Sequence, residues 1–229
     1  MNTIDILDDI IHHKNGIIFQ INQIEECLLI LKSMSEDKEK LNSGKFSNYF
    51  AFTENLIIEK MLLSLGKIYD QYEDKDGGNK VRSIRQLIKF LEKNPNLYEN
   101  IKLHSYTEGS DNKRFLKNFN INEIKSNEEF IALIKNENPL DDRRLRNKFT
   151  QLRNKYLAHN EQHFTISNNN NLDWSEFYEL LDFAKDCIHT ISWLYLNIPC
   201  YFNGKFIQLY SSERTEYCFQ NVKNLIPEK

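Results

Sequence analysis

An arginine and a histidine six positions apart are the residues of this chain best suited to act on a phosphodiester. They lie in residues 152–160, which read LRNKYLAHN. Arg153 is a fixed cation that could stabilise charge on a phosphorane, and His159 could exchange a proton near neutral pH. Asn154 follows the arginine and could orient either group or the phosphate oxygens. We therefore take Arg153, Asn154 and His159 as candidate catalytic residues.

The spacing of this pair limits how its side chains can meet. The preceding residues predict a helix opened by Pro139, with Asp141 and Asp142 in its first turn, where carboxylates complement the helix dipole. Six steps along such a helix place Arg153 and His159 about 120° apart and roughly 9 Å along the axis. Either the helix ends between them, or a second copy of the chain packs beside it so that the two pairs converge.

The same predicted helix has an apolar seam and a basic face. The apolar positions fall within about 60° of one another: Leu145, Phe149, Leu152 and Tyr156. Six cations occupy thirteen positions with no acidic residue among them: Arg143, Arg144, Arg146, Lys148, Arg153 and Lys155. Because the formal net charge is −3, affinity for nucleic acid must come from such a local patch. Arg143, Arg146 and Lys155 are candidate substrate contacts, and the alternative is an ordinary solvated helix face.

Helical periodicity continues along most of the chain and predicts an all-α fold. With 40% hydrophobic residues and only 7 Gly and 4 Pro in 229 positions, the chain can form one packed core with few breaks. Apolar residues recur at three- and four-residue steps in five further segments: residues 3–33, 47–72, 81–93, 128–134 and 174–198. Asp173 and Glu176 form a predicted capping pair for the last of these.

The remaining segments predict smaller features of a single domain covering residues 1–229. Residues 36–40 read as a charged loop, and residues 96–138 as an insertion with weak periodicity. Residues 200–229 form a C-terminal extension. Asn203-Gly204 predicts a small β-hairpin there, followed by a short helix near residues 215–225.

Several classes of protein are disfavoured by the same sequence. The N-terminus lacks the basic and apolar segments of a signal peptide, and no apolar run reaches the ~18 residues that a membrane span needs, so we expect a cytosolic protein. The four cysteines form no C-x-x-C pair and should be reduced and mostly buried. His12 and His13 follow Asp8 and Asp9 by one turn, which ordinary surface pairing explains better than a metal site. We expect no metal and no cofactor.

The motif and its helical frame resemble the HEPN superfamily. That superfamily is marked by an arginine, a polar residue that is often asparagine, and a histidine after four to six intervening residues. Arg153-Asn154 and Ala158-His159 match this pattern, and the leucine- and tyrosine-containing form looks most like the abortive-infection, AbiU-like branch. The resemblance implies an HEPN-like helical bundle and covers the helical frame, not the insertion or the tail.

The resemblance also implies a function. Many members are metal-independent endoribonucleases, and members are typically homodimers in which two copies of the motif meet. We therefore expect a toxin or antiphage abortive-infection effector that cleaves RNA through Arg153, Asn154 and His159. Some members are silenced by a nucleotidyltransferase antitoxin that modifies a tyrosine two places after the histidine. Position 161 is Glu161 here, which argues against that form of control while leaving another antitoxin possible.

Two other interpretations remain open at this point. A non-catalytic HEPN-like dimer could bind RNA, a nucleotide or a protein partner through the same cationic face. A plain interaction scaffold would leave Arg153 and His159 apart and facing solvent. If the pair is only structural, Arg153 binds a surface carboxylate and His159 rests near a helix terminus, where its protonated form is favoured. His163 adds a second histidine one turn after His159, but the order H-N-E-Q-H is not that of a zinc protease and lacks an evident third ligand.

Overall fold

The computed structural model describes residues 2–43, 47–70, 82–100, 116–119, 124–159, 172–202 and 205–206. At positions 40, 42–43, 98–100, 153–159 and 202 it describes the backbone alone. These residues form a helical bundle with one two-stranded hairpin, which confirms the predicted all-α class. None of the described helices combines the length and the apolar character that crossing a membrane would require.

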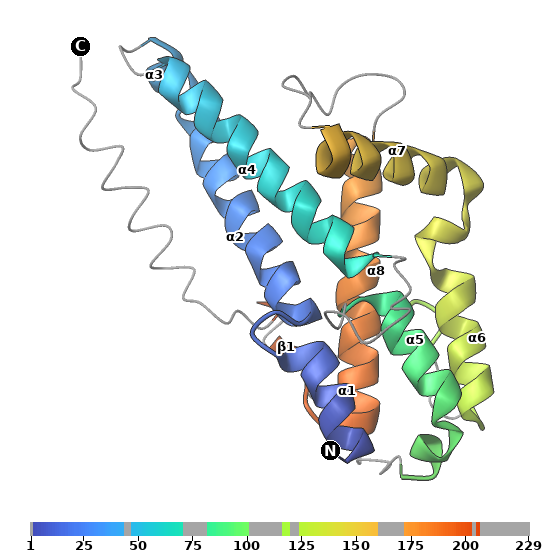
Figure 1. Ribbon diagram of the computed structural model, residues 1–229. Helices are drawn as coiled ribbons and strands as arrows, with labels where there is room; N and C mark the ends of the chain where they lie inside the picture. The colour runs from blue at the N-terminus through green and yellow to red at the C-terminus, as the bar shows by residue number, and fades with distance from the viewer. Residues whose placement is uncertain are drawn as a thin grey trace.

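The helices pack around α8, which runs through the middle of the molecule (Figure 1). The long helices α2 and α4 lie side by side on one flank of it, while α5 and α6 form a pair on the other. Helix α7 crosses the upper end of α8. The α-helices are α1 (Thr3–His12), α2 (Ile17–Glu36), α3 (Lys38–Ser43), α4 (Ser47–Ile68), α5 (Ile84–Lys93), α6 (Asn127–Glu137), α7 (Arg143–His159) and α8 (Trp174–Ile191). The short elements are the 3-10 turns η1 (Pro95–Asn100) and η2 (Pro139–Asp141), the π turn η3 (Ser192–Leu196) and the strands β1 (Tyr201–Phe202) and β2 (Lys205–Phe206).

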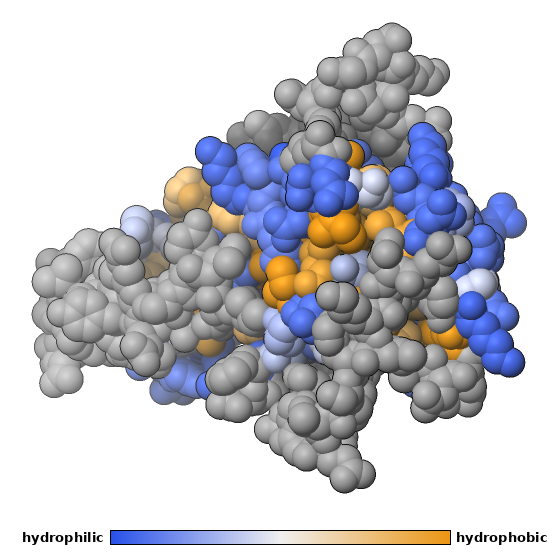
Figure 2. All heavy atoms as spheres, turned by 90° about the horizontal axis from the view of Figure 1, so that it is seen from below, coloured by the Kyte–Doolittle hydropathy of each residue, from blue (hydrophilic) through white to orange (hydrophobic). Residues whose placement is uncertain are grey.

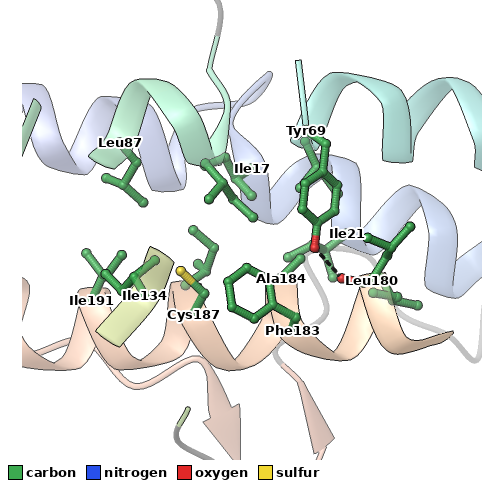
Figure 3. Close-up of a cluster of buried hydrophobic side chains, with 14 of the residues drawn as sticks. Ile17, Ile21, Tyr69, Leu87, Ile134, Leu180, Phe183, Ala184, Cys187 and Ile191 are labelled. Carbon is green, nitrogen blue, oxygen red and sulfur yellow. Dashed lines mark hydrogen bonds between the residues drawn. The ribbon is translucent and has the colours of Figure 1, made fainter. Parts of the chain in front are cut away.

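Helix α8 is central because a continuous apolar stripe runs along it and most of its side chains are buried. Phe177, Leu181, Ala184 and Ile188 are all at most 1% exposed. Figure 3 shows side chains of α2, α5 and α6, together with Tyr69, pointing toward this helix. The hydroxyl of Tyr69, just after α4, donates a hydrogen bond of 2.7 Å to the carbonyl of Leu180 and so ties the end of α4 to α8. Seen from below, hydrophilic side chains surround a central apolar area (Figure 2).

Side-chain caps set the first residue of several helices. Asp173 accepts a hydrogen bond from the backbone of Glu176, and the Glu176 carboxylate accepts one from the backbone of Asp173, which confirms the predicted capping pair. Asn2 and Asp5 form the same arrangement at α1. Ser83 and Ser126 cap α5 and α6 in the simpler one-sided way.

The segment predicted as one helical stretch over residues 3–33 is two helices. The chain turns at Gly16, whose N–H donates a hydrogen bond of 2.6 Å to the carbonyl of His13. A Cβ at this position would lie 2.7 Å from the carbonyl oxygen of Ile11 and 2.9 Å from that of His13, so only glycine fits. The predicted charged loop at residues 36–40 was also wrong, because α3 begins at Lys38.

The motif helix α7 begins later than the sequence predicted. Pro139 opens the separate turn η2, in which the Asn138 side chain accepts a hydrogen bond of 3.1 Å from the backbone N–H of Leu140. Asp142 then has extended backbone angles and accepts a bond of 2.7 Å from the backbone N–H of Arg144. Asp142 is therefore the N-cap of α7, and the helix starts at Arg143 rather than at Pro139.

The predicted hairpin is present next to the C-terminal end of α8. Tyr201 pairs with Phe206 and Phe202 with Lys205 in antiparallel register. The hydroxyl of Tyr201 donates a hydrogen bond of 2.8 Å to Asp186, which fastens the hairpin to α8. The helix predicted near residues 215–225 lies outside the described residues.

Candidate active site

Helix α7 positions the three candidate catalytic residues on one unbroken element. Its backbone is helical from Arg143 to His159, and the side chains of residues 153–159 lie outside the described part of the structure. The first of the two predicted arrangements, a helix that ends between Arg153 and His159, is therefore not what the backbone adopts. By helical geometry their Cα positions remain about 120° apart around the axis and roughly 9 Å apart along it.

An apolar seam fixes this helix to the rest of the bundle. Leu145, Phe149 and Leu152 are 2%, 5% and 4% exposed, as the sequence predicted. The ring of Phe149 meets that of Tyr69 edge to face, with centroids 5.7 Å apart. The fourth predicted seam residue, Tyr156, lies outside the described side chains. Because α7 contacts α4 and its seam is buried, the axis of α7 has a defined direction relative to the core.

On one edge of the basic face, two cations share an acidic residue of α8. Lys148 binds both carboxylate oxygens of Glu176, at 2.7 and 2.9 Å, and Arg144 binds the same carboxylate at 3.2 Å. The Glu176 side chain is 6% exposed and that of Lys148 17%. Sequence reasoning assigned Glu176 only a capping role, because a contact between residues 28 positions apart leaves no local signal. These two cations therefore hold α7 against α8.

The other edge keeps its charge. Arg146 donates hydrogen bonds from Nε to the carbonyl of Leu140, at 2.8 Å, and from Nη2 to that of Asp141, at 3.0 Å. Carbonyl oxygens orient a guanidinium without cancelling its charge. Within the described ranges no ion pair to Arg146 is present. Arg143 is exposed in the first turn, and the side chain of Lys155 lies outside the described part.

The other histidine side chains that the structure describes have structural partners. His12 Nε2 lies 2.9 Å from the hydroxyl of Ser192, and burial lowers the pKa of His12. The Nδ1 of His13 accepts a hydrogen bond from the backbone of Asn15. His189 is fully buried, its Nδ1 accepts a bond of 3.0 Å from the backbone N–H of Cys200, and burial lowers its pKa to about 4. Each of these three imidazoles thus has a contact within the fold.

The described cysteines are buried and free, as predicted. Burial raises the pKa of Cys27 and of Cys200 to about 11, and raises that of Cys187 further still. A thiol reacts as its thiolate, so these three are unsuited to nucleophilic catalysis. Cys218 lies outside the described residues.

The N-terminal aspartates and histidines do not gather around a common point. The Asp9 carboxylate binds the guanidinium of Arg82 at 3.0 Å, and His12 is directed toward Ser192 instead. Across the described ranges, no three His, Cys, Asp or Glu side chains come together as metal ligands. The second histidine of the H-N-E-Q-H stretch, His163, lies outside them.

Comparison with known families shows to which family the chain belongs. The sequence profile of the HEPN family AbiU2 matches residues 7–203, a span that includes residues 96–138, which the resemblance noted above did not cover. No curated protein matches the chain, and no solved structure does. The match covers most of the length, and α7 of the helical bundle contains the arginine-asparagine and histidine positions of the motif. The chain therefore belongs to the AbiU2 family of HEPN proteins.

Proposed function

We propose that this protein is a metal-independent endoribonuclease that acts as a toxin or antiphage abortive-infection effector. The observation that supports this best is the unbroken helix α7, which presents Arg153, Asn154 and His159 in its last two turns. A seam of buried residues orients that helix, and the edge of it that includes Arg146 keeps its positive charge. The family assignment agrees with this role.

The reaction we propose is transesterification within the RNA strand. The 2′-oxygen of a ribose attacks the adjacent phosphorus, and the bond from phosphorus to the 5′-oxygen of the next nucleotide breaks. The proton lost by the 2′-hydroxyl is replaced by one gained at the leaving 5′-oxygen, so the products are a 2′,3′-cyclic phosphate and a 5′-hydroxyl. His159 takes or gives the proton, Arg153 stabilises the phosphorane, and Asn154 orients one of them or the phosphate. DNA lacks the attacking group and is not a substrate.

The active form in this proposal is a homodimer with a composite site. On one straight helix the backbone directions at Arg153 and His159 diverge by about 120°, so one copy does not direct both side chains at one phosphate. A two-fold related copy packed beside the last turns of α7 brings the second pair to the same cleft. The arginine of one protomer then works with the histidine of its partner.

Cleavage of labelled RNA in EDTA tests the activity. Purified wild-type protein should cut single-stranded RNA with the chelator present, while Arg153→Ala and His159→Ala should each lose at least a hundredfold in rate, as general acid–base and electrostatic contributions of this size require. Lys125→Ala, which removes an exposed cation before α6, is the matched control and should cut at the wild-type rate.

Three results would count against the proposal. Equal cleavage by all variants would indicate another site or a contaminating nuclease. Cleavage that EDTA abolishes would make the chemistry metal-dependent. RNA binding without any cleavage by the wild-type dimer would favour the non-catalytic alternative, in which the same cationic face only binds.

A further inference from the structure

Helix α4 has an apolar stripe on the side that faces away from the core. Tyr49, Phe52 and Leu56 are 58%, 60% and 47% exposed, more than any other large apolar side chain that the structure describes. At 100° per residue these three positions and Leu63 fall within about 60° of one another, and the buried side chains of α4 are centred on the opposite side. Contiguous exposed apolar side chains mark an interaction surface.

This α4 stripe has the spacing of a coiled-coil seam. Tyr49, Phe52, Leu56, Glu59 and Leu63 follow one another by three, four, three and four residues, the alternation of a and d positions in a heptad. A helix with such a seam packs lengthwise against a second helix. None of the described helices of the same chain covers the three exposed side chains, so the second helix belongs to another molecule.

The order of side chains along the α4 stripe makes it self-complementary when two copies run antiparallel. A two-fold axis midway between Phe52 and Leu56 places Phe52 of each copy against Leu56 of the other. The same axis places Glu59 across from Tyr49, whose phenolic hydroxyl can donate a hydrogen bond to the carboxylate. Parallel helices would instead bring the two Glu59 carboxylates together, and opposed like charges destabilise an interface. The α4 stripe therefore fits a second, antiparallel copy of this chain.

The α4 stripe lies on a helix that contacts the motif helix. Figure 1 shows the last turns of α7 directed toward α4, and the two helices are in contact. A stable interface buries about 800 Å² on each partner, which is more than these few side chains provide. The second copy must therefore also cover surface beside α4. Two-fold symmetry then places the α7 helices of both copies at the same interface.

We propose that the α4 stripe is the surface on which a second copy of this chain packs antiparallel to complete the catalytic site. This inference rests on the proposed function and names the interface that its composite site requires. The α4 helices of the two copies form the centre of the dimer, and Arg153 and His159 of each copy border it.

Sedimentation of the whole chain over a range of concentrations tests this interface. Phe52→Glu and Leu56→Glu should each raise the dissociation constant of the dimer about a hundredfold, because each substitution buries two charges, one from each copy. Both side chains are largely exposed in a single copy, so circular dichroism should show an unchanged helix content. Ile198→Glu places the same charge on an exposed apolar residue beyond α8 and should leave the dissociation constant unchanged.

Cysteine cross-linking tests the antiparallel direction. A mixture of Phe52→Cys and Leu56→Cys proteins should form more disulfide-linked dimer on mild oxidation than either protein alone, because these two positions oppose each other across the axis. The described native cysteines are buried and should contribute little to the cross-linking. Cross-links that form only within the separate proteins would indicate parallel helices and overturn the proposal.

Cleavage of labelled RNA by the same glutamate variants separates the interface from the nuclease. Loss of both dimer and cleavage in Phe52→Glu and Leu56→Glu, with Ile198→Glu unaffected, supports the proposal. Variants that stay dimeric, or a wild-type chain that is itself monomeric, overturn it whether or not RNA is cut. Monomeric variants of a wild-type dimer that cuts no RNA support the interface and overturn the nuclease. Monomeric variants that cut RNA at the wild-type rate overturn the composite site and leave the nuclease intact.

Discussion

Lys148 of α7 lies 2.7 and 2.9 Å from the two carboxylate oxygens of Glu176, the residue that also completes the cap of α8. The contact joins the motif helix to the central helix of the bundle at a point where both side chains are largely buried. It also divides the basic face of α7. Lys148 and Arg144 bind this carboxylate, whereas Arg146, on the opposite edge, donates to the backbone carbonyls of Leu140 and Asp141.

Replacing Glu176 should destabilise the protein while leaving the cap of α8 in place. Glutamine keeps the shape and can still accept the hydrogen bond from the backbone of Asp173, but it removes the charged carboxylate that binds Lys148. We expect Glu176→Gln to lower the free energy of unfolding by about 2 kcal/mol in urea titrations.

Two comparisons isolate the ion pair. Arg144→Ala removes a side chain that is 67% exposed and should cost less than about 1 kcal/mol. Lys148→Met combined with Glu176→Gln should recover part of the loss, because no buried charge is then left unpaired. An unchanged urea midpoint in Glu176→Gln would show that this ion pair does not stabilise the fold.

Mixing two inactive variants should restore activity if the site is composite. In a heterodimer of Arg153→Ala and His159→Ala protomers, one protomer still supplies the histidine and its partner the arginine. After random exchange of subunits, cleavage should rise to at most about a quarter of the wild-type rate per protein. Cleavage that stays at the level of the separate variants, with heterodimer formation verified, would show that each protomer uses its own pair.

Stability should fall as the pH drops, because His189 is buried in its neutral form. Its pKa is about 4 in the fold, against about 6.5 in an unfolded chain, so the unfolded chain binds more protons between these values. The contribution of neutral His189 to the free energy of unfolding is complete above pH 6.5 and is lost as the pH falls toward 4. Between pH 7 and pH 5 we expect a loss of about 2 kcal/mol in urea titrations.

His189→Gln is the control for this pH dependence. Glutamine does not titrate, and its carbonyl can accept the hydrogen bond from the backbone of Cys200. The variant should have a flatter profile over the same range, with a residual slope from His12, whose pKa burial also lowers. A profile as steep as that of the wild type would assign the pH dependence to other groups.

Two glycines should respond to alanine in opposite directions. At Gly16 a Cβ would lie 2.7 Å from a backbone oxygen, so Gly16→Ala should lower the free energy of unfolding by about 1–3 kcal/mol. At Gly66, inside α4, no atom lies within 4 Å of an added Cβ, and Gly66→Ala should raise it by about 0.5–1 kcal/mol. Thermal melts of the two variants would check both signs, and equal shifts would contradict the close approach at Gly16.

The helices that the sequence predicts well are those with local signals. The three- and four-residue spacing of apolar side chains predicts α4, α5, α6 and α8, and the pair Asp173 and Glu176 predicts where α8 starts. The seam of Leu145, Phe149 and Leu152 is predictable for the same reason. Each of these signals lies within a few residues, where helix geometry alone decides which side chains share a face.

The residues at which helices begin and end were less predictable from the sequence. The break at Gly16 depends on carbonyl groups of the preceding turn, and the start of α7 depends on competition between Pro139 and Asp142 as the opening residue. Periodicity continues across both points, so it gives no sign of either one.

For the candidate site, the sequence by itself determined which residue types are available: an arginine, an asparagine and a histidine at fixed spacing, within a run of cations. Only the tertiary structure decided which of those cations form ion pairs, because Glu176 comes from another helix and binds Arg144 and Lys148. It also decided that α7 continues unbroken to His159. Spacing along a chain fixes angles around one helix, whereas charge neutralisation and surface shape depend on elements that only folding brings together.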